Sequence, residues 1–181
     1  MNDQKIVELQ LDRKIENFFK TASYCPFGFP AVVTVNPFVN NIPAPTIYWL
    51  SCPYLRYEVD LLEGESNMIS ELVEMLKYDR KFKELMDETH KKYAVKRKKL
   101  LSAEQLQKAK KISEDLYNTL SESGVGGIKD KDGIKCLHTH LADYLVDGFN
   151  PVGKKVFEKV NWPKSCKICR ERIDEIESSS N

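Results

Sequence analysis

The chain has 181 residues, a length near the upper end of one ordinary domain. Its 28 Lys and Arg balance 27 Asp and Glu, and a net charge of +1 argues against a protein built mainly to coat nucleic acid. It has no run of about 18 apolar residues and no secretory-signal pattern at the charged N-terminus, so we expect a cytoplasmic protein without a membrane span. One domain over residues 1–177 and a disordered tail over 178–181 are expected.

Three short strands are predicted within the first 50 residues. Residues 18–24 are the first candidate, followed by the β-branched segment 31–35 (AVVTV) and the β-branched and aromatic segment 46–50 (TIYWL). The turn-forming residues between them favour an antiparallel meander. In such a meander the first and third strands run parallel, so their carboxyl ends are expected at the same edge of the sheet.

The remainder of the chain has the pattern of helices. Apolar residues recur at helical spacing in three segments between residues 53 and 99, and again after Ser102, which forms a capping-box pattern with Gln105. The helices on either side of Lys99 are expected to form a long hairpin. Further helices are expected after a glycine-rich break at residues 124–133. The predicted fold is therefore α+β, with a small three-stranded antiparallel sheet near the N-terminus packed with a mostly helical remainder.

Two of the five cysteines are predicted to lie together. Disulfides are improbable in a chain without an export pattern, so metal binding or thiol chemistry is the better interpretation. Cys25 and Cys52 follow the first and the third predicted strand, and the meander places both at one sheet edge. Cys52 also precedes a predicted helix, whose N-terminus stabilises a thiolate. The alternative for either residue is a small buried hydrophobic side chain.

Cys136, His138 and His140 form the densest group of possible ligands. If all three lie on a helix, Cys136 and His140 share a face with Asp143. His138 then points about 200° away from Cys136, so the three side chains can bind one ion only if the helix begins after Cys136. We therefore expect one histidine to be a ligand and the other to be a polar group in or beside the core.

The pair Cys166 and Cys169 has CxxC spacing, which is half of a zinc knuckle. Because no second CxxC exists, a metal site here needs ligands from elsewhere in the chain. The alternative is two unrelated thiols near a flexible end. A thioredoxin-like role is disfavoured because no βαβ pattern precedes the pair.

A strongly basic run lies near the predicted hairpin tip. It favours the solvated face of a helix, and the alternative is a contact for nucleic acid or an acidic partner. The residues of this run are Lys91, Lys92, Lys96, Arg97, Lys98 and Lys99.

Four segments together resemble a known family. They are CPFGFPAVV from Cys25, PTIYWLSCP ending at Pro53, GIKCLH ending at His138, and NPVG from Asn150. Their order and spacing are similar to those of the bacterial family catalogued as domain of unknown function 501. The resemblance implies a bacterial cytosolic role without naming an activity. It also implies a metal ligand at Cys52, because the family pattern accepts His at that position.

Three functional hypotheses follow. The first is a metal-binding protein that holds zinc or, as the weaker alternative, an iron–sulfur cluster. Its expected ligands are Cys25, Cys52, Cys136 and either His138 or His140, with Cys166 and Cys169 as weaker candidates. Four protein ligands would make the site structural, whereas an open position would allow hydrolysis, with Asp143 as a proton acceptor.

The second hypothesis is a thiol-dependent enzyme, with Cys136 or Cys52 as nucleophile and His140 or His138 as base. The third is an interaction module that binds a partner or nucleic acid through the basic hairpin.

Overall fold

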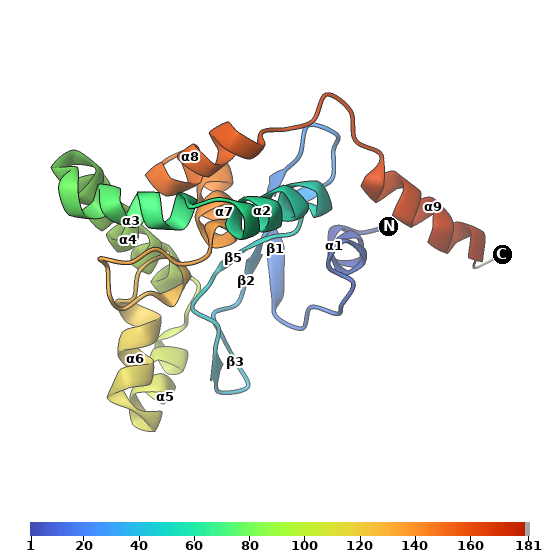
Figure 1. The fold of residues 1–181 in the computed structure, drawn as a ribbon. Helices are drawn as coiled ribbons and strands as arrows, with labels where there is room; N and C mark the ends of the chain where they lie inside the picture. Colours follow the sequence, from blue (N-terminus) through green and yellow to red (C-terminus); the bar gives the residue numbers. More distant parts are fainter. Residues whose placement is uncertain (180–181) are drawn as a thin grey trace.

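The computed structural model describes residues 1–179 and has the predicted α+β fold, in which helices surround a small antiparallel sheet (Figure 1). The three sheet strands are β1 (Phe18–Tyr24), β2 (Pro30–Val35) and β5 (Tyr48–Leu50), in the order β1-β2-β5. Both neighbours of β2 are antiparallel to it, so β1 and β5 run parallel to each other, as the meander predicts.

Strand β2 is buried along its whole length because helices cover both faces of the sheet. Val33 and Val35 pack with Val7 of α1 (Asp3–Leu11), whereas Val32 belongs to the main core with Leu141 of α7 (Leu137–Asp147). This two-sided burial explains why the strand is a continuous β-branched run rather than an alternating one.

A second, two-stranded sheet between β2 and β5 was not predicted. Strands β3 (Phe38–Val39) and β4 (Ile42–Pro43) pair around Asn40 and Asn41, both of which have positive φ angles. Asparagine tolerates this left-handed region better than most residues, and two such residues are typical of a tight hairpin turn.

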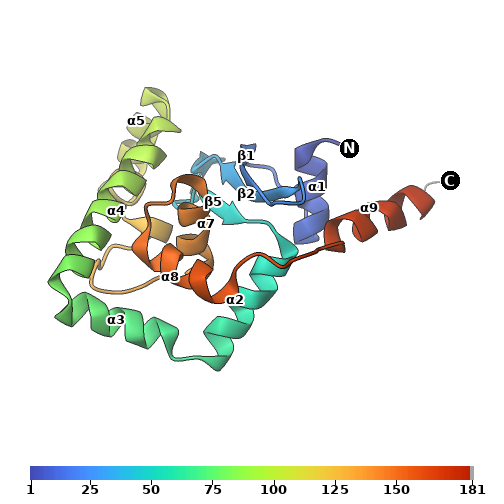
Figure 2. The same ribbon diagram turned by 90° about the horizontal axis from the view of Figure 1, so that it is seen from above.

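Seven further helices complete the described part of the chain, together with a 3-10 turn at Val125–Gly127 (Figure 2). They are α2 (Pro53–Glu65), α3 (Met68–Tyr78), α4 (Arg80–Lys99), α5 (Ala103–Ile112), α6 (Glu114–Ser121), α8 (Pro151–Val160) and the C-terminal helix α9 (Ile168–Ser179). None of the helices within residues 1–179 combines the length and the apolar character that crossing a membrane requires.

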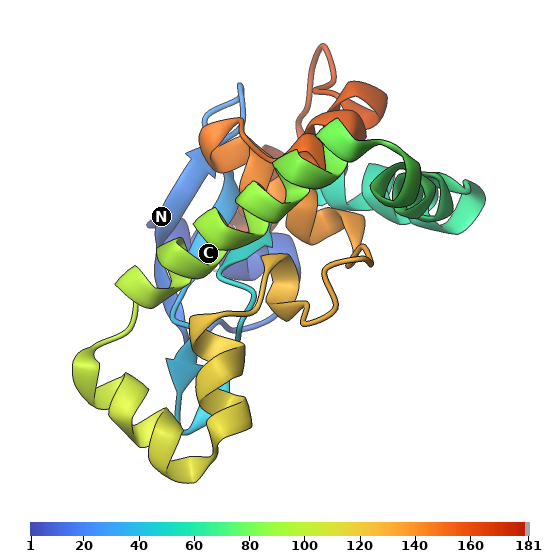
Figure 3. The same ribbon diagram turned by 90° about the vertical axis from the view of Figure 1, so that its left-hand side faces the viewer.

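The predicted long hairpin begins at α4, but its second arm is broken. Ser113 has extended backbone angles, and its side chain accepts a hydrogen bond from the Leu116 amide, so α5 ends there and α6 begins. The predicted capping box of Ser102 and Gln105 starts α5. Figure 3 shows α6 turning back from α5 toward α4.

The Asn150–Gly153 segment explains the close packing of α7 and α8. Asn150 caps α8 by accepting a hydrogen bond from the Gly153 amide, 2.9 Å away. A Cβ atom at Gly153 would lie 2.1 Å from the carbonyl oxygen of His140. Glycine is therefore required where α8 approaches the backbone of α7.

The two chain ends lie on the same side of the molecule, where α9 packs against α1 (Figures 1 and 2). An Nη1 group of Arg172 donates hydrogen bonds to the carbonyl oxygens of Leu9 and Gln10, each 3.0 Å away. Helix α9 continues through Ser179, so residues 178 and 179 of the expected disordered tail are helical, and residues 180–181 lie outside the described residues.

Candidate metal centre

Four of the five cysteines line one small, largely apolar pocket: Cys25, Cys52, Cys166 and Cys169. Aromatic rings and a proline form the rest of its wall, from Phe27, Phe29, Tyr54, Trp162 and Pro163. The thiols come from three segments that are distant in sequence. Such convergence is difficult to explain as the packing of unrelated small residues.

The sheet positions the first two thiols. Cys25 directly follows β1 and opens a tight turn. Its amide donates to the Phe29 carbonyl, 2.8 Å away, and its own carbonyl accepts from the Gly28 amide, 3.0 Å away. Cys52 follows β5, and its amide donates to the Ala31 carbonyl of β2 at 3.2 Å. Because β1 and β5 run parallel, both thiols reach the same edge of the sheet, as the sequence predicts.

The C-terminal segment brings the other two thiols. Trp162 follows α8 in the chain. Its ring packs edge-on against the ring of Phe157, with 5.9 Å between the two ring centroids. Cys169 then lies in the first turn of α9, where it is buried and accepts a hydrogen bond from Gln10 Nε2 at 3.3 Å. The same Nε2 donates to the Pro30 carbonyl at 2.8 Å, so Gln10 links the sulfur to β2.

The pocket disfavours free thiolates. Burial raises the pKa of Cys52 to about 11, with further contributions from Cys169 and Cys25. Burial also raises the pKa of Cys169, although the hydrogen bond from Gln10 acts in the opposite direction. Without a cation, these two sulfurs are therefore protonated near neutral pH and unreactive as nucleophiles.

The enclosed volume is about 10 Å³, roughly the space of one water molecule or ion. Within the described residues, no three of the four sulfurs lie within 4.8 Å of one another. Sulfur ligands 2.3 Å from a tetrahedral zinc ion would be about 3.8 Å apart, so a bound ion would draw the thiols closer together.

Cys136 does not line this pocket, so the expected single site of Cys25, Cys52 and Cys136 with a histidine is not the arrangement found. Helix α7 begins at Leu137, and Cys136 precedes it as the N-cap residue. This start after Cys136 brings its thiol to His138 rather than to His140. The sequence showed that the grouping depends on whether the helix begins after Cys136, but a helix start cannot be located to one residue from sequence.

His140 and Asp143 belong to a buried polar cluster instead. The Nδ1 atom of His140 lies 3.2 Å from the Asn150 amide nitrogen, and burial lowers its pKa to about 3. Asp143 forms an ion pair with Lys96, 2.8 Å away, and accepts a hydrogen bond from Asn150. Because both side chains are engaged in the core, neither is available to the thiols of the pocket.

Cys136 and His138 form a separate group with Glu63, and the ligand atoms of these three residues all lie within 4.8 Å of one another. The hydrogen bond with His138 lowers the pKa of Cys136, despite the opposing effect of burial. Burial acts to lower the pKa of His138, but Cys136 and the nearby carboxylates of Glu63 and Asp60 raise it overall. Neither carboxylate was predicted, although their spacing of three residues places them on one face of α2.

The basic run is not a continuous accessible surface. Arg97 is fully buried and donates to the carbonyl oxygens of Pro45, Leu120, Ser123 and Gly124. Lys96 pairs with two aspartates of α7. Both residues hold α4 against the rest of the molecule, so the expected contact surface is reduced to the exposed residues Lys91, Lys92, Lys98 and Lys99.

The fold and the pocket define an α+β protein with a four-thiol cluster at one sheet edge. The chain belongs to the family described as protein of unknown function (DUF501), which matches residues 21–158, well over half of the chain. This confirms the resemblance found in the sequence. The match includes Cys25, Cys52, Cys136 and His138, whereas the CxxC pair follows it. No curated protein and no solved structure matches the chain.

Proposed function

We propose that this protein binds a metal ion through the thiolates of Cys25, Cys52, Cys166 and Cys169. The observation that carries the proposal is the convergence of four cysteines from three distant segments on one pocket. A site with four protein ligands has no open position, so its role is structural. The ion would join the C-terminal segment to the sheet edge.

Zinc fits the pocket better than an iron–sulfur cluster. The two Cys-Pro pairs would suit a cluster, which cysteines also bind in sets of four. However, a cluster of several iron and sulfide ions needs much more space than about 10 Å³. A single ion needs only that the four sulfur atoms move closer together.

The contacts of α9 support a structural role. Helix α9 packs on α1, with Arg172 and the Gln10–Cys169 bond among the polar links. Cys169 and Ile173 are its buried apolar residues. Because so few side chains of this segment are buried, four metal–sulfur bonds would supply much of the attachment.

Cobalt substitution tests the proposal. Co²⁺ bound by four thiolates absorbs strongly through sulfur-to-metal charge transfer, and this band should lose most of its intensity in a Cys166→Ser, Cys169→Ser double variant. Ser165→Ala is the matched control in the same exposed loop and should keep the band. Hydrogen exchange of residues 161–179 should rise in the double variant. An intact thiolate band in the double variant would exclude this ligand set.

A further inference from the structure

A second group of ligand-type side chains lies where α2 meets the start of α7. Glu63 comes from α2, Cys136 is the N-cap of α7, and His138 lies in its first turn. Carboxylate, thiolate and imidazole groups are all zinc ligands, and here their atoms lie within 4.8 Å of one another. The group is separate from the four-thiol pocket and shares no residue with it.

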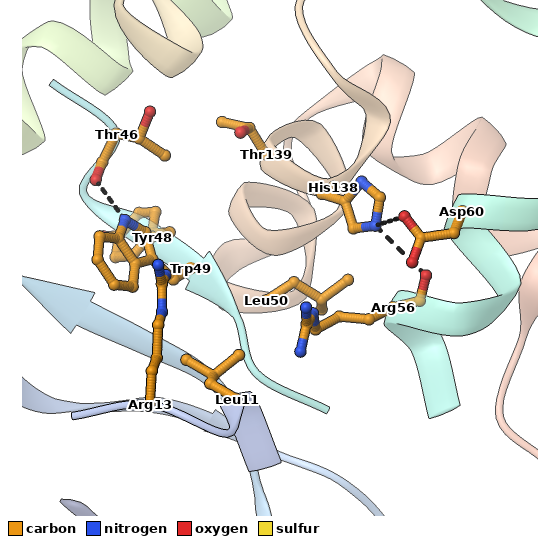
Figure 4. Close-up of a pocket in the computed structure, with 10 residues that line it drawn as sticks. All are labelled: Leu11, Arg13, Thr46, Tyr48, Trp49, Leu50, Arg56, Asp60, His138 and Thr139. Atoms are coloured by element: carbon orange, nitrogen blue, oxygen red, sulfur yellow. Dashed lines mark hydrogen bonds and ion pairs between the residues drawn. The ribbon is translucent and has the colours of Figure 1, made fainter. Parts of the chain in front are cut away.

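The histidine ring is oriented as a metal ligand is. Its Nδ1 atom faces the group and lies 3.6 Å from Glu63 Oε2. Its Nε2 atom lies 3.3 Å from Asp60 Oδ1 and 3.3 Å from the Arg56 carbonyl (Figure 4). Metal-bound histidines generally donate their second ring N–H to a carboxylate or carbonyl, which fixes the ring and the tautomer.

The charges around the ring also favour a cation. Glu63 and Asp60 are two carboxylates beside one imidazole, and Cys136 adds a third acidic group. A zinc-bound His138 is neutral, because Nδ1 would bind the ion while Nε2 keeps its proton. A divalent ion between Glu63, Cys136 and His138 would therefore offset two of the three negative charges, one more than a protonated imidazole does.

The same contacts argue against Cys136 as a free nucleophile. The Leu137 amide at the helix N-terminus, which could stabilise an anionic intermediate, already donates to Glu63 Oε1. A carboxylate beside the sulfur and the imidazole is suitable as a third metal ligand.

We propose that Glu63, Cys136 and His138 form a second metal centre, which binds one zinc ion and keeps a coordination position open to solvent. Cys136 is an exposed residue, so the group lies at the surface, where water can reach the fourth position. Three protein ligands with one open position characterise catalytic zinc sites.

The centre lies at the margin of a cleft of about 510 Å³, which His138 and Asp60 line together with two arginines. Figure 4 shows that Arg13 and Arg56 enter this cleft from different elements, Arg13 from beyond α1 and Arg56 from α2. Guanidinium groups bind carboxylates and phosphates. The ligand class that this cleft suits is therefore a small anion, held beside the metal centre.

Zinc titration of the full chain by calorimetry, after it is purified with its resident metal, tests the centre. The wild type should take up one further zinc ion, and Asp60→Asn should bind it on the order of 10–100-fold more weakly. His138→Gln and Cys136→Ser should lose this binding. Glu65→Gln, an exposed glutamate of the same helix, is the control and should bind as the wild type does.

Alkylation provides a second readout. Zinc should protect Cys136 from iodoacetamide in the wild type and leave it unprotected in His138→Gln. Equal alkylation rates with and without zinc would overturn the proposal and identify Cys136 as a free reactive thiol. The Cys166→Ser, Cys169→Ser variant should keep this protection, so failure at the four-thiol pocket is distinguishable from failure here.

Discussion

Acid should destabilise this protein through two buried histidines. Burial lowers the pKa of His140 to about 3 and that of His90 to about 4, compared with about 6.5 in the unfolded chain. Below pH 6.5 the unfolded state therefore binds protons that the folded state does not. The free energy of unfolding falls with decreasing pH until each folded-state pKa is reached.

The magnitude follows from the width of this pH window. Each histidine contributes about 1.4 kcal/mol per pH unit below 6.5, so lowering the pH to about 5 costs about 2 kcal/mol per residue. The hydrogen bonds agree with neutral rings, because His90 Nδ1 accepts from the Val125 amide at 3.1 Å. The two residues together would remove a large part of an ordinary domain's stability.

Urea unfolding at about pH 7.5 and about pH 5 measures this effect. The wild type is compared with His140→Gln, which retains a group able to hydrogen-bond Asn150. The variant should lose about 2 kcal/mol less than the wild type between the two pH values. Other titrating groups, including Asp143, are present in both proteins and cancel in this comparison. An identical pH dependence in the two proteins would refute a neutral, buried His140.

Three further predictions concern packing, a buried charge and thiol reactivity. Gly153→Ala should destabilise the fold by about 1–3 kcal/mol or more, because its Cβ meets the His140 carbonyl; an unchanged melting temperature would contradict this. Arg97→Met leaves buried carbonyls without a donor, at roughly 1–3 kcal/mol each, and Arg97→Lys should recover only part of the lost melting temperature. In chelator, mass spectrometry should find Cys136 alkylated first and Cys52 among the last, because their pKa values are shifted in opposite directions; equal rates would exclude this difference.

The sheet could be predicted from the sequence, and so could the position of Cys25 and Cys52 at the same edge of it. Both follow from local signals: β-branched segments, proline-rich turns and the parallel relation of the outer strands in a meander. The break at Ser113 could not be predicted from spacing, because the apolar pattern continues across it. The extended backbone at this residue is what ends α5.

The division of the candidate ligands between two groups could not be predicted from the sequence. Whether Cys136 is placed with His138 or His140 depends on whether α7 begins one residue earlier or later. The CxxC pair reaches Cys25 and Cys52 only because α9 packs on α1, a contact between the two ends of the chain. The burial of Arg97 likewise depends on distant loops. Without knowledge of these tertiary contacts, a basic run predicts a solvent-exposed helix face.

Metal and acid-labile sulfide content of the untagged protein tests the central claim most directly. The account predicts at least one zinc ion per chain without sulfide, and loss of one equivalent in the Cys166→Ser, Cys169→Ser variant but not in Ser165→Ala. Iron with matching sulfide would keep the four-thiol site and replace zinc with a cluster. A folded wild type that contains neither metal, and whose stability chelator and added zinc leave unchanged, would contradict the account.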